Sequence, residues 1–234
     1  MAHLIDAFQA AFSLLLNFEE SLAEIVSLSL LVSISAVLLA ALLALPLGAA
    51  LAVTRFPGER LCTILLNALM GLPPVVVGLA VYLLLSRSGP LGEHGLLFTP
   101  AAMITAQCIL VTPLIAALTR QVTADLWIEY REQLSSLGCG RLETLATLLW
   151  EGRYSLLTVV LAGFGRAISE VGAVLIVGGN IVHHTRVMTT SIALETAKGD
   201  LALALGLGIV LILLASIINA AAYLTKEVTQ HVSP

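Results

Sequence analysis

The sequence predicts an all-α integral membrane protein with about five transmembrane helices, an N-terminal interfacial helix and a pair of short cytoplasmic helices. Of its 234 residues, 59% are hydrophobic and only 11% are charged, and the mean hydropathy is +1.01. These values lie outside the range of water-soluble domains. One bilayer crossing needs about 20 mainly apolar residues, and none of the apolar runs alternates as barrel strands do. Five stretches are long enough: 25–53, 62–85, 99–118, 156–177 and 201–224.

The segment that precedes the first span is the least defined part of the pattern. Its apolar stretch is short and is broken by Asp6 and Gln9, which favours an amphipathic helix lying in the membrane interface over a sixth span. A cleaved signal peptide is disfavoured because the charged first region is missing. The expected organisation is an N-terminal amphipathic segment (1–24), a transmembrane domain (25–225) that includes a cytoplasmic segment (120–153), and a cytoplasmic tail (226–234).

The positions of the basic residues predict the orientation, because cytoplasmic loops carry the excess of Lys and Arg. Three lie in loops on one side: Arg87, Arg186 and Lys198. Seven lie on the other side: Arg55, Arg60, Arg120, Arg131, Arg141, Arg153 and Lys226. We therefore expect the 120–153 segment and the C-terminus in the cytoplasm and the N-terminus outside.

The first two spans carry signs of close packing and of breaks. Small residues recur at every fourth position of the first span, which lets another helix approach closely. Pro46 in the same span favours a bend. In the second span, Pro73 and Pro74 together predict a break. The small residues of the first span are Ala36, Ala40, Ala44, Gly48 and Ala52.

The segment 120–153 is too polar to cross a membrane, yet its apolar residues have a helical period. We expect two short amphipathic helices separated at Gly138 and Gly140, with Gly138 as a left-handed C-terminal cap. More than thirty ordered residues in such a loop favour a docking role. The apolar positions are Leu126, Tyr130, Leu134 and Leu137 in the first helix, and Leu142, Leu145, Leu148 and Leu149 in the second.

Two charged residues lie inside the fourth span, in the stretch FGRAISEVGA. A lone charge at the bilayer centre costs about 2.5–3.5 kcal/mol or more, so Arg166 and Glu170 must face protein or water. Their spacing of four places them on one face of a continuous helix, where each can neutralise the other. Two interpretations stay open: a pair that locks the helix to its neighbours, or a pair that borders the path of a divalent oxyanion.

The chain has no catalytic or nucleotide-binding motif. It contains no GxxxxGK[ST] phosphate loop, and its only lysines are Lys198 and Lys226. His183 and His184 form the one histidine pair, which we interpret as part of an external loop and not as a metal site. The three cysteines lack metal or disulfide spacing. Energy for uphill transport must therefore come from an ion gradient or from another polypeptide docked on the 120–153 segment.

Several stretches resemble the permease subunits of binding-protein-dependent ABC importers. Glu132 and Gly138 match the EAA---G loop of that family, whereas Gln133 and Leu134 stand where it has two alanines and its ILP ending is absent. The stretches GLPPVVVGLAVYLLLSRSGPLG, FGRAISEVGAVLIVGGNI and HTRVMTTSIALETAKGD resemble permeases of molybdate and tungstate importers, and the last one is more similar to the tungstate branch.

The resemblance implies the ABC importer permease fold and import of a tetrahedral oxyanion by alternating access, with tungstate preferred over molybdate or vanadate. A gradient-driven transporter or channel that works without an ATPase is the alternative of a different class. The implied ATPase-coupling residues are Glu132, Gln133, Leu134 and Gly138. The candidates for the translocation path are Arg166, Ser169, Glu170 and Gly172.

The resemblance also implies the partners. We expect a homodimer, because five spans are too few to enclose a gated path and the chain has no internal repeat. Two copies of a cytoplasmic ABC ATPase would bind ATP and Mg, so the chain itself is expected to hold no cofactor and to be no enzyme. An external or periplasmic oxyanion-binding protein and membrane lipid complete the expected partners, with no nucleic acid. The expected location is the inner membrane of a prokaryotic cell.

Overall fold

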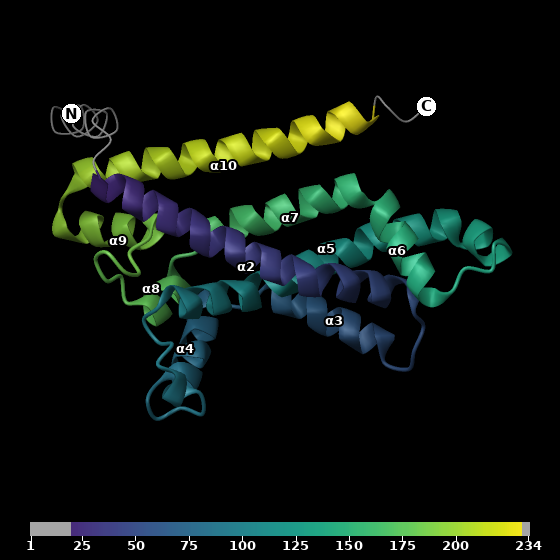
Figure 1. Ribbon diagram of the computed structural model, residues 1–234, viewed down its shortest axis with the longest axis horizontal. Helices are drawn as coiled ribbons and strands as arrows, with labels where there is room; N and C mark the ends of the chain where they lie inside the picture. Colours follow the sequence, from purple (N-terminus) through teal and green to yellow (C-terminus); the bar gives the residue numbers. More distant parts are fainter. Residues whose placement is uncertain (1–19, 231–234) are drawn as a thin grey trace. The chain divides into compact units, whose positions relative to one another are not determined.

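The computed structural model describes residues 20–230, and every regular element in this part of the chain is helical (Figure 1). The predicted N-terminal segment lies mainly outside the described residues, as does the end of the predicted tail. The elements are α2 (Glu20–Val53), α3 (Glu59–Met70), α4 (Pro74–Leu85), the 3-10 turn η1 (Gly92–His94), α5 (Pro100–Ser136), α6 (Arg141–Glu151), α7 (Arg153–Ile168), α8 (Gly172–Gly178), α9 (Met188–Lys198) and α10 (Leu201–Gln230).

Within the described part of the chain, three helices are long and apolar enough to cross a membrane: Leu22–Val53, Pro100–Ser136 and Leu201–Ile218. The number rises to five if the broken pairs α3 with α4 and α6 with α7 each count as one span. This confirms the prediction of an all-α, multi-pass membrane protein. The predicted break at Pro73 is also confirmed, because Pro73 has an extended backbone (ψ 122°) and α4 begins at the next residue.

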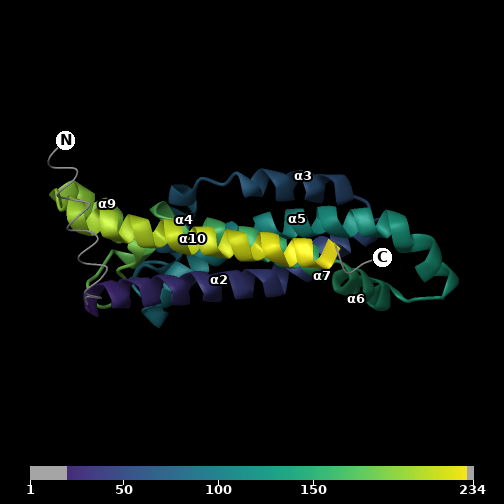
Figure 2. The same ribbon diagram turned by 90° about the horizontal axis from the view of Figure 1, so that it is seen from above.

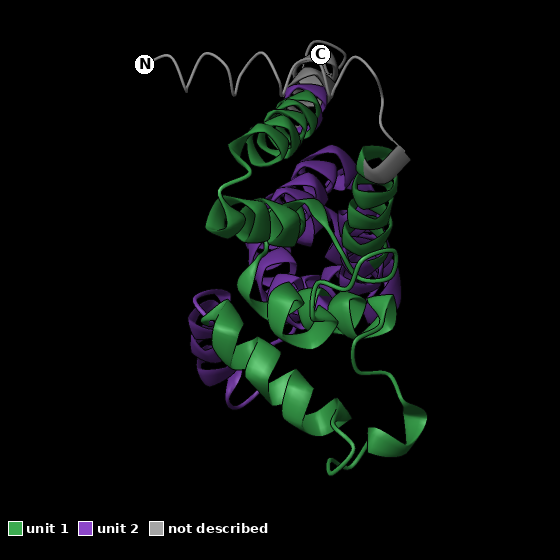
Figure 3. Cartoon of the chain, turned by 90° about the vertical axis from the view of Figure 1, so that its left-hand side faces the viewer, with its two compact units in different colours: residues 1–35, 73–107, 167–217 green, residues 36–72, 108–166, 218–234 purple. Residues whose placement is uncertain are grey.

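The described chain divides into two compact units (Figure 3). The first contains the described residues of 1–35, 73–107 and 167–217, and the second those of 36–72, 108–166 and 218–234. The loops expected outside the cell, 86–99 and 178–200, fall in the first unit. The 120–153 segment, expected in the cytoplasm, falls in the second.

In the second unit, the small residues of α2 pack against α5, which runs beside this part of α2 (Figures 1 and 2). Ala40 and Ala44 are completely buried. A Cβ atom at Gly48 would overlap the carbonyl oxygen of Ala116 and lie 2.8 Å from Cβ of Thr119. The predicted close approach of another helix is thus confirmed, and the helix belongs to the same chain.

The opposite face of α2 in this unit is apolar and exposed. Leu38 is 61% exposed, Leu42 72% and Leu43 60%. Exposed leucines next to a buried stripe of small residues are what a lipid-facing helix requires, because the hydrocarbon core accepts apolar side chains while the small residues permit close helix packing.

The prediction of two separate short helices in 120–153 is wrong in its first half. α5 continues without a break from Pro100 to Ser136, a length of 37 residues. The stretch between Arg120 and Ser136 contains neither Gly nor Pro, so nothing in it stops a helix. Since about 20 residues suffice to cross the bilayer, α5 is long enough to cross it and continue beyond. The second predicted helix is present as α6.

Candidate functional site

The first candidate site is the turn between α5 and α6, which we name the coupling turn (residues 132–142). α5 ends in a Schellman motif: the N–H of Gly138 donates to the carbonyl of Ser135 at 3.1 Å, and that of Cys139 to the carbonyl of Leu134 at 3.1 Å. Gly138 has φ +70°, the left-handed conformation that its predicted role demands. The Glu143 carboxylate then accepts the Gly140 N–H at 2.7 Å and starts α6. Backbone hydrogen bonds thus fix the reversal of the chain.

The side chains of the coupling turn divide into an internal anchor and an exposed surface. Leu134 is only 6% exposed, so this predicted coupling residue faces the protein interior, whereas Glu132 and Gln133 are exposed. Leu137 and Leu142 are 78% and 81% exposed. The sequence pattern predicted both leucines as apolar positions of two amphipathic helices, and in the structure both are exposed at the turn.

One face of α6 is buried at Thr144 and Leu148, whereas Trp150 is exposed. Leu148 is completely buried. At Gly152, where α6 and α7 meet at a bend of 75°, a Cβ atom would lie 2.9 Å from a methyl carbon of Leu126. The coupling turn therefore lies at the end of a packed pair of helices (Figure 2).

The second candidate site is the stretch that holds the predicted path residues. The fourth span was expected as one helix over 156–177, and this expectation is wrong. α7 ends at Ile168, with Arg166 in its last turn, and α8 begins only at Gly172. Ser169 and Glu170 lie in the break between them. Arg166 and Glu170 therefore do not share one helix face.

Glu170 shapes this break. It is 4% exposed, and its carboxylate accepts the Ala173 N–H at 3.3 Å, which satisfies one of the free donors at the start of α8. Its backbone carbonyl accepts the Thr189 hydroxyl at 2.9 Å and so joins the break to α9. Gly172 allows α8 to approach α4, since a Cβ there would lie 3.0 Å from a methyl carbon of Val75. These contacts favour a structural role for Glu170 and Gly172.

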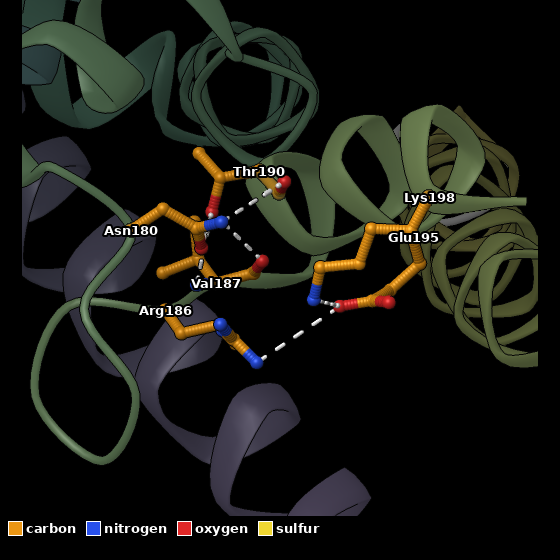
Figure 4. A network of polar contacts seen from close by, with 6 residues as sticks. All are labelled: Asn180, Arg186, Val187, Thr190, Glu195 and Lys198. Atoms are coloured by element: carbon orange, nitrogen blue, oxygen red, sulfur yellow. Dashed lines mark hydrogen bonds and ion pairs between the residues drawn. The ribbon is translucent and has the colours of Figure 1, made fainter. Parts of the chain in front are cut away.

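Sequence reasoning missed a polar network on and before α9, which we name the α9 network (Asn180, Arg186, Val187, Thr190, Glu195 and Lys198; Figure 4). The Thr190 hydroxyl donates to Oδ1 of Asn180 at 2.9 Å and accepts the Val187 N–H at 3.2 Å. Glu195, 5% exposed, pairs with Lys198 at 3.0 Å and with Arg186 at 4.0 Å. The sequence signal for this network was the spacing of Glu195 and Lys198, three residues apart. Gly199 follows them and caps α9 at φ +87°.

A cavity of about 350 Å³ lies between α5 and α7 in the second unit. Its lining mixes apolar side chains with hydroxyl, amide and carboxylate groups. Its lining contains no Lys or Arg, and the Asp125 carboxylate would repel an anion, so the cavity does not favour anion binding. It is lined by Leu118, Gln121, Val122, Asp125, Ser155, Thr158, Val159 and Ala162.

Among the described residues, no group of three or more His, Cys, Asp or Glu side chains could hold a metal ion. Cys62, Cys108 and Cys139 are free thiols. Nδ1 of His183 lies 2.6 Å from a carboxylate oxygen of Glu24, so this exposed histidine contacts the first part of α2.

No protein-family model matches the chain. It is 43% identical over 97% of its length to the whole of the tungstate uptake system permease protein TupB of Peptoclostridium acidaminophilum. It is 38% identical, over 93% of its length and 91% of the relative's, to the protein of the same name from Campylobacter jejuni. A probable anion ABC transporter permease protein of Haloferax volcanii is 42% identical over 85% of this chain and 88% of its own.

The matches with the two tungstate uptake permeases cover 97% and 93% of the chain, at 43% and 38% identity. The helical, multi-pass architecture agrees with them. The chain therefore belongs to the family of ABC transporter permease proteins that includes the tungstate uptake permeases.

Proposed function

We propose that the chain is the membrane subunit of an ATP-driven importer that moves a tetrahedral oxyanion, tungstate in preference to molybdate or vanadate, into the cytoplasm. The observation that carries the substrate is the similarity to two tungstate uptake permeases over nearly the whole chain. Weaker similarity to a sulfate transport permease of Salmonella typhimurium, 29% over 62% of this chain, agrees with a tetrahedral dianion as the class of substrate.

The coupling turn supports the ATP-driven step. Two leucines that are 78% and 81% exposed, on a turn fixed by backbone hydrogen bonds, form a small rigid apolar surface that a partner protein can cover. We assign this surface to a cytoplasmic ABC ATPase, which binds ATP and Mg in place of this chain. Closing and opening of two ATPase copies would move the coupling turns and alternate the access of the path between the two sides.

The weak burial of α10 supports a homodimer. Only 17% of its most apolar window, within Leu201–Ile218, is buried in the chain. A span with so few contacts in its own chain faces lipid or a second copy. A twofold axis would place equivalent elements of the two copies around one path. In this arrangement Arg166, Ser169, Glu170 and Gly172 contribute the broken span beside the path, and Glu170 holds the break in shape.

The charge distribution supports the orientation. We assign the coupling turn to the cytoplasmic side and the loop that precedes α9 to the outer side of the inner membrane. An external oxyanion-binding protein would deliver the anion at the outer side. The N-terminus then lies outside and the C-terminus in the cytoplasm.

Reconstitution in liposomes tests this function. The purified chain, the ATPase encoded with it and the corresponding binding protein should give tungstate uptake that requires ATP and stops when the ATPase is omitted. Uptake by the permease alone, driven by an imposed ion gradient, would instead establish the gradient-driven alternative. Competition with equal concentrations of molybdate and vanadate, in the presence of the binding protein, orders the three anions.

A further inference from the structure

Arg186 is a largely buried cation with too few acceptors. Its side chain is 19% exposed, and Nη1 lies 4.0 Å from Oε1 of Glu195, the upper limit of an ion pair. Its Nε–H is buried, and the described residues offer it no hydrogen-bond acceptor. A guanidinium has five N–H donors, and buried donors are normally satisfied. The side chain is thus held by one loose contact and keeps unused donors.

Glu195 does not supply the missing acceptors, because it is engaged elsewhere. Its carboxylate binds Nζ of Lys198 at 3.0 Å, and its side chain is 7% exposed. Figure 4 shows that Arg186 and Lys198 approach the same carboxylate oxygen, Oε1 of Glu195. Two cations around one carboxylate leave a net charge of +1 in this cluster. Such a cluster attracts an anion without already being neutralised.

Arg186 also lines a cavity of about 50 Å³ in the first unit, so its donors have space beside them. The other charged group there, the Glu24 carboxylate, is bound by His183 at 2.6 Å. Arg186 is therefore the one Lys or Arg residue in the lining of this cavity. The lining is Glu24, Ile25, Leu28, Val182, His183, His184 and Arg186.

We infer that Arg186 binds the tetrahedral dianion in transit, donating hydrogen bonds to two of its oxygens from the side that faces this cavity. The inference rests on the proposed function. The planar fork of N–H groups fits an oxyanion in a bidentate manner, which a lysine ammonium does not. The 4.0 Å contact to Glu195 positions the guanidinium without fixing it. The nearby Glu195 carboxylate weakens the electrostatic attraction between Arg186 and the anion, so the anion can be released.

Binding of sodium tungstate by the purified permease–ATPase complex tests this role. Equilibrium dialysis at low salt, with tungsten measured by mass spectrometry, is run for the wild type, Arg186→Gln, Arg186→Lys and the control Arg87→Gln. Arg87 is an exposed arginine in the other loop of the first unit. We expect Arg186→Gln to bind at least about tenfold more weakly, the usual loss for a hydrogen bond to a charged group, with Arg87→Gln unchanged.

Arg186→Lys separates binding from folding. It keeps the charge, so it should keep the thermal stability of the wild type while it binds tungstate several-fold more weakly. Wild-type binding by Arg186→Lys and by Arg186→Gln, or no tungstate binding by the wild type, overturns the inference. If the wild-type complex imports tungstate with ATP and Arg186→Gln does so equally well, the inference fails and the proposed function stands.

A lipid phosphate has the same tetrahedral chemistry, and a parallel measurement distinguishes it. The complex is placed in phosphatidylcholine nanodiscs with and without phosphatidylglycerol, and bound lipid is counted by native mass spectrometry. We expect Arg186→Gln to retain phosphatidylglycerol as the wild type does. Loss of that lipid with unchanged tungstate binding would show that Arg186 holds a headgroup, and would contradict the inference.

Discussion

The coupling turn exposes apolar side chains, whereas the α9 network contains a buried polar group that lacks a hydrogen-bond acceptor. In the coupling turn the backbone polar groups are bonded, through the Gly138 cap and the Glu143 carboxylate, while Leu137 and Leu142 stay exposed. In the α9 network Val187 and Thr190 are buried, while the Nε–H of the largely buried Arg186 has no acceptor among the described residues. Exposed apolar groups favour a protein partner, and an unsatisfied buried cation favours an anion. The two regions therefore indicate two partners of different chemistry.

The largest effect is expected from Gly138→Val, which strains the backbone of the coupling turn. No atom within 4 Å would meet the new Cβ, so the cost is conformational: a β-branched residue at φ +70° costs about 1–3 kcal/mol. The turn should relax into another conformation, and Leu137 and Leu142 should then point in other directions. We expect ATP-driven tungstate uptake to fall at least about tenfold, since about 1.4 kcal/mol corresponds to a factor of ten, with normal membrane insertion.

Gly58→Val is the matched control for this variant. Gly58 also has a left-handed backbone (φ +99°) and open space around its Cβ position. It lies before α3, away in sequence from the coupling turn. Equal loss of uptake in both variants would mean that backbone strain in general, and not the coupling turn, impairs transport.

An intermediate effect is expected in the α9 network from Thr190→Val, which is nearly isosteric. It removes the hydroxyl that bonds Asn180 at 2.9 Å and Val187 at 3.2 Å. Leaving buried groups unsatisfied costs about 1–3 kcal/mol, which lowers Tm by about 2–4 °C per kcal/mol in a chain of this size. Differential scanning fluorimetry in detergent measures the shift.

Thr105→Val provides the comparison for Thr190→Val. Thr105 is exposed, and its hydroxyl donates only to the Ala101 carbonyl of its own helix, at 2.8 Å. We expect a change within about 0.5 kcal/mol. A shift as large as that of Thr190→Val would show that the α9 network is not a special source of stability.

The smallest effect is expected from Glu170→Gln. This variant tests whether the break between α7 and α8 requires the negative charge of Glu170. A glutamine oxygen can still accept the Ala173 N–H, so stability should change by less than about 1 kcal/mol and uptake should continue. Glu170→Leu removes the acceptor and should cost about 1 kcal/mol more. A stable Glu170→Gln protein that no longer imports tungstate would restore Glu170 to the path as a charge.

Features that depend on local rules could be predicted from the sequence. Two adjacent prolines break a helix wherever they occur, and a glycine after an amphipathic run caps it, so Pro73 and Gly138 were placed correctly. The small residues of α2 were also sufficient to predict a close helix contact. The continuous α5 could have been predicted, because its polar part contains no helix breaker.

Features that depend on distant partners could not be predicted. The break after α7 needs the Glu170 carboxylate at Ala173, and it is fixed by a bond from Thr189 on another helix. The start of α9 is held by Ser29 of α2, whose hydroxyl accepts the Met188 N–H at 2.8 Å. A hydropathy pattern contains no information about such tertiary bonds. The α9 network therefore became visible only in the structure.

The most direct test measures both ATPase affinity and tungstate binding in a variant of each region. Two proteins are compared: the double variant Leu137→Ser/Leu142→Ser and the single variant Arg186→Gln. For each, biolayer interferometry measures the affinity for the ATPase, and dialysis measures tungstate binding. We expect the leucine variant to lose about tenfold or more in ATPase affinity and to bind tungstate normally, because two exposed anchors contribute more than about 1 kcal/mol. Arg186→Gln should show the reverse. If either variant loses both activities, or the leucine variant keeps full ATPase affinity, the assignment of two partners to two regions is contradicted.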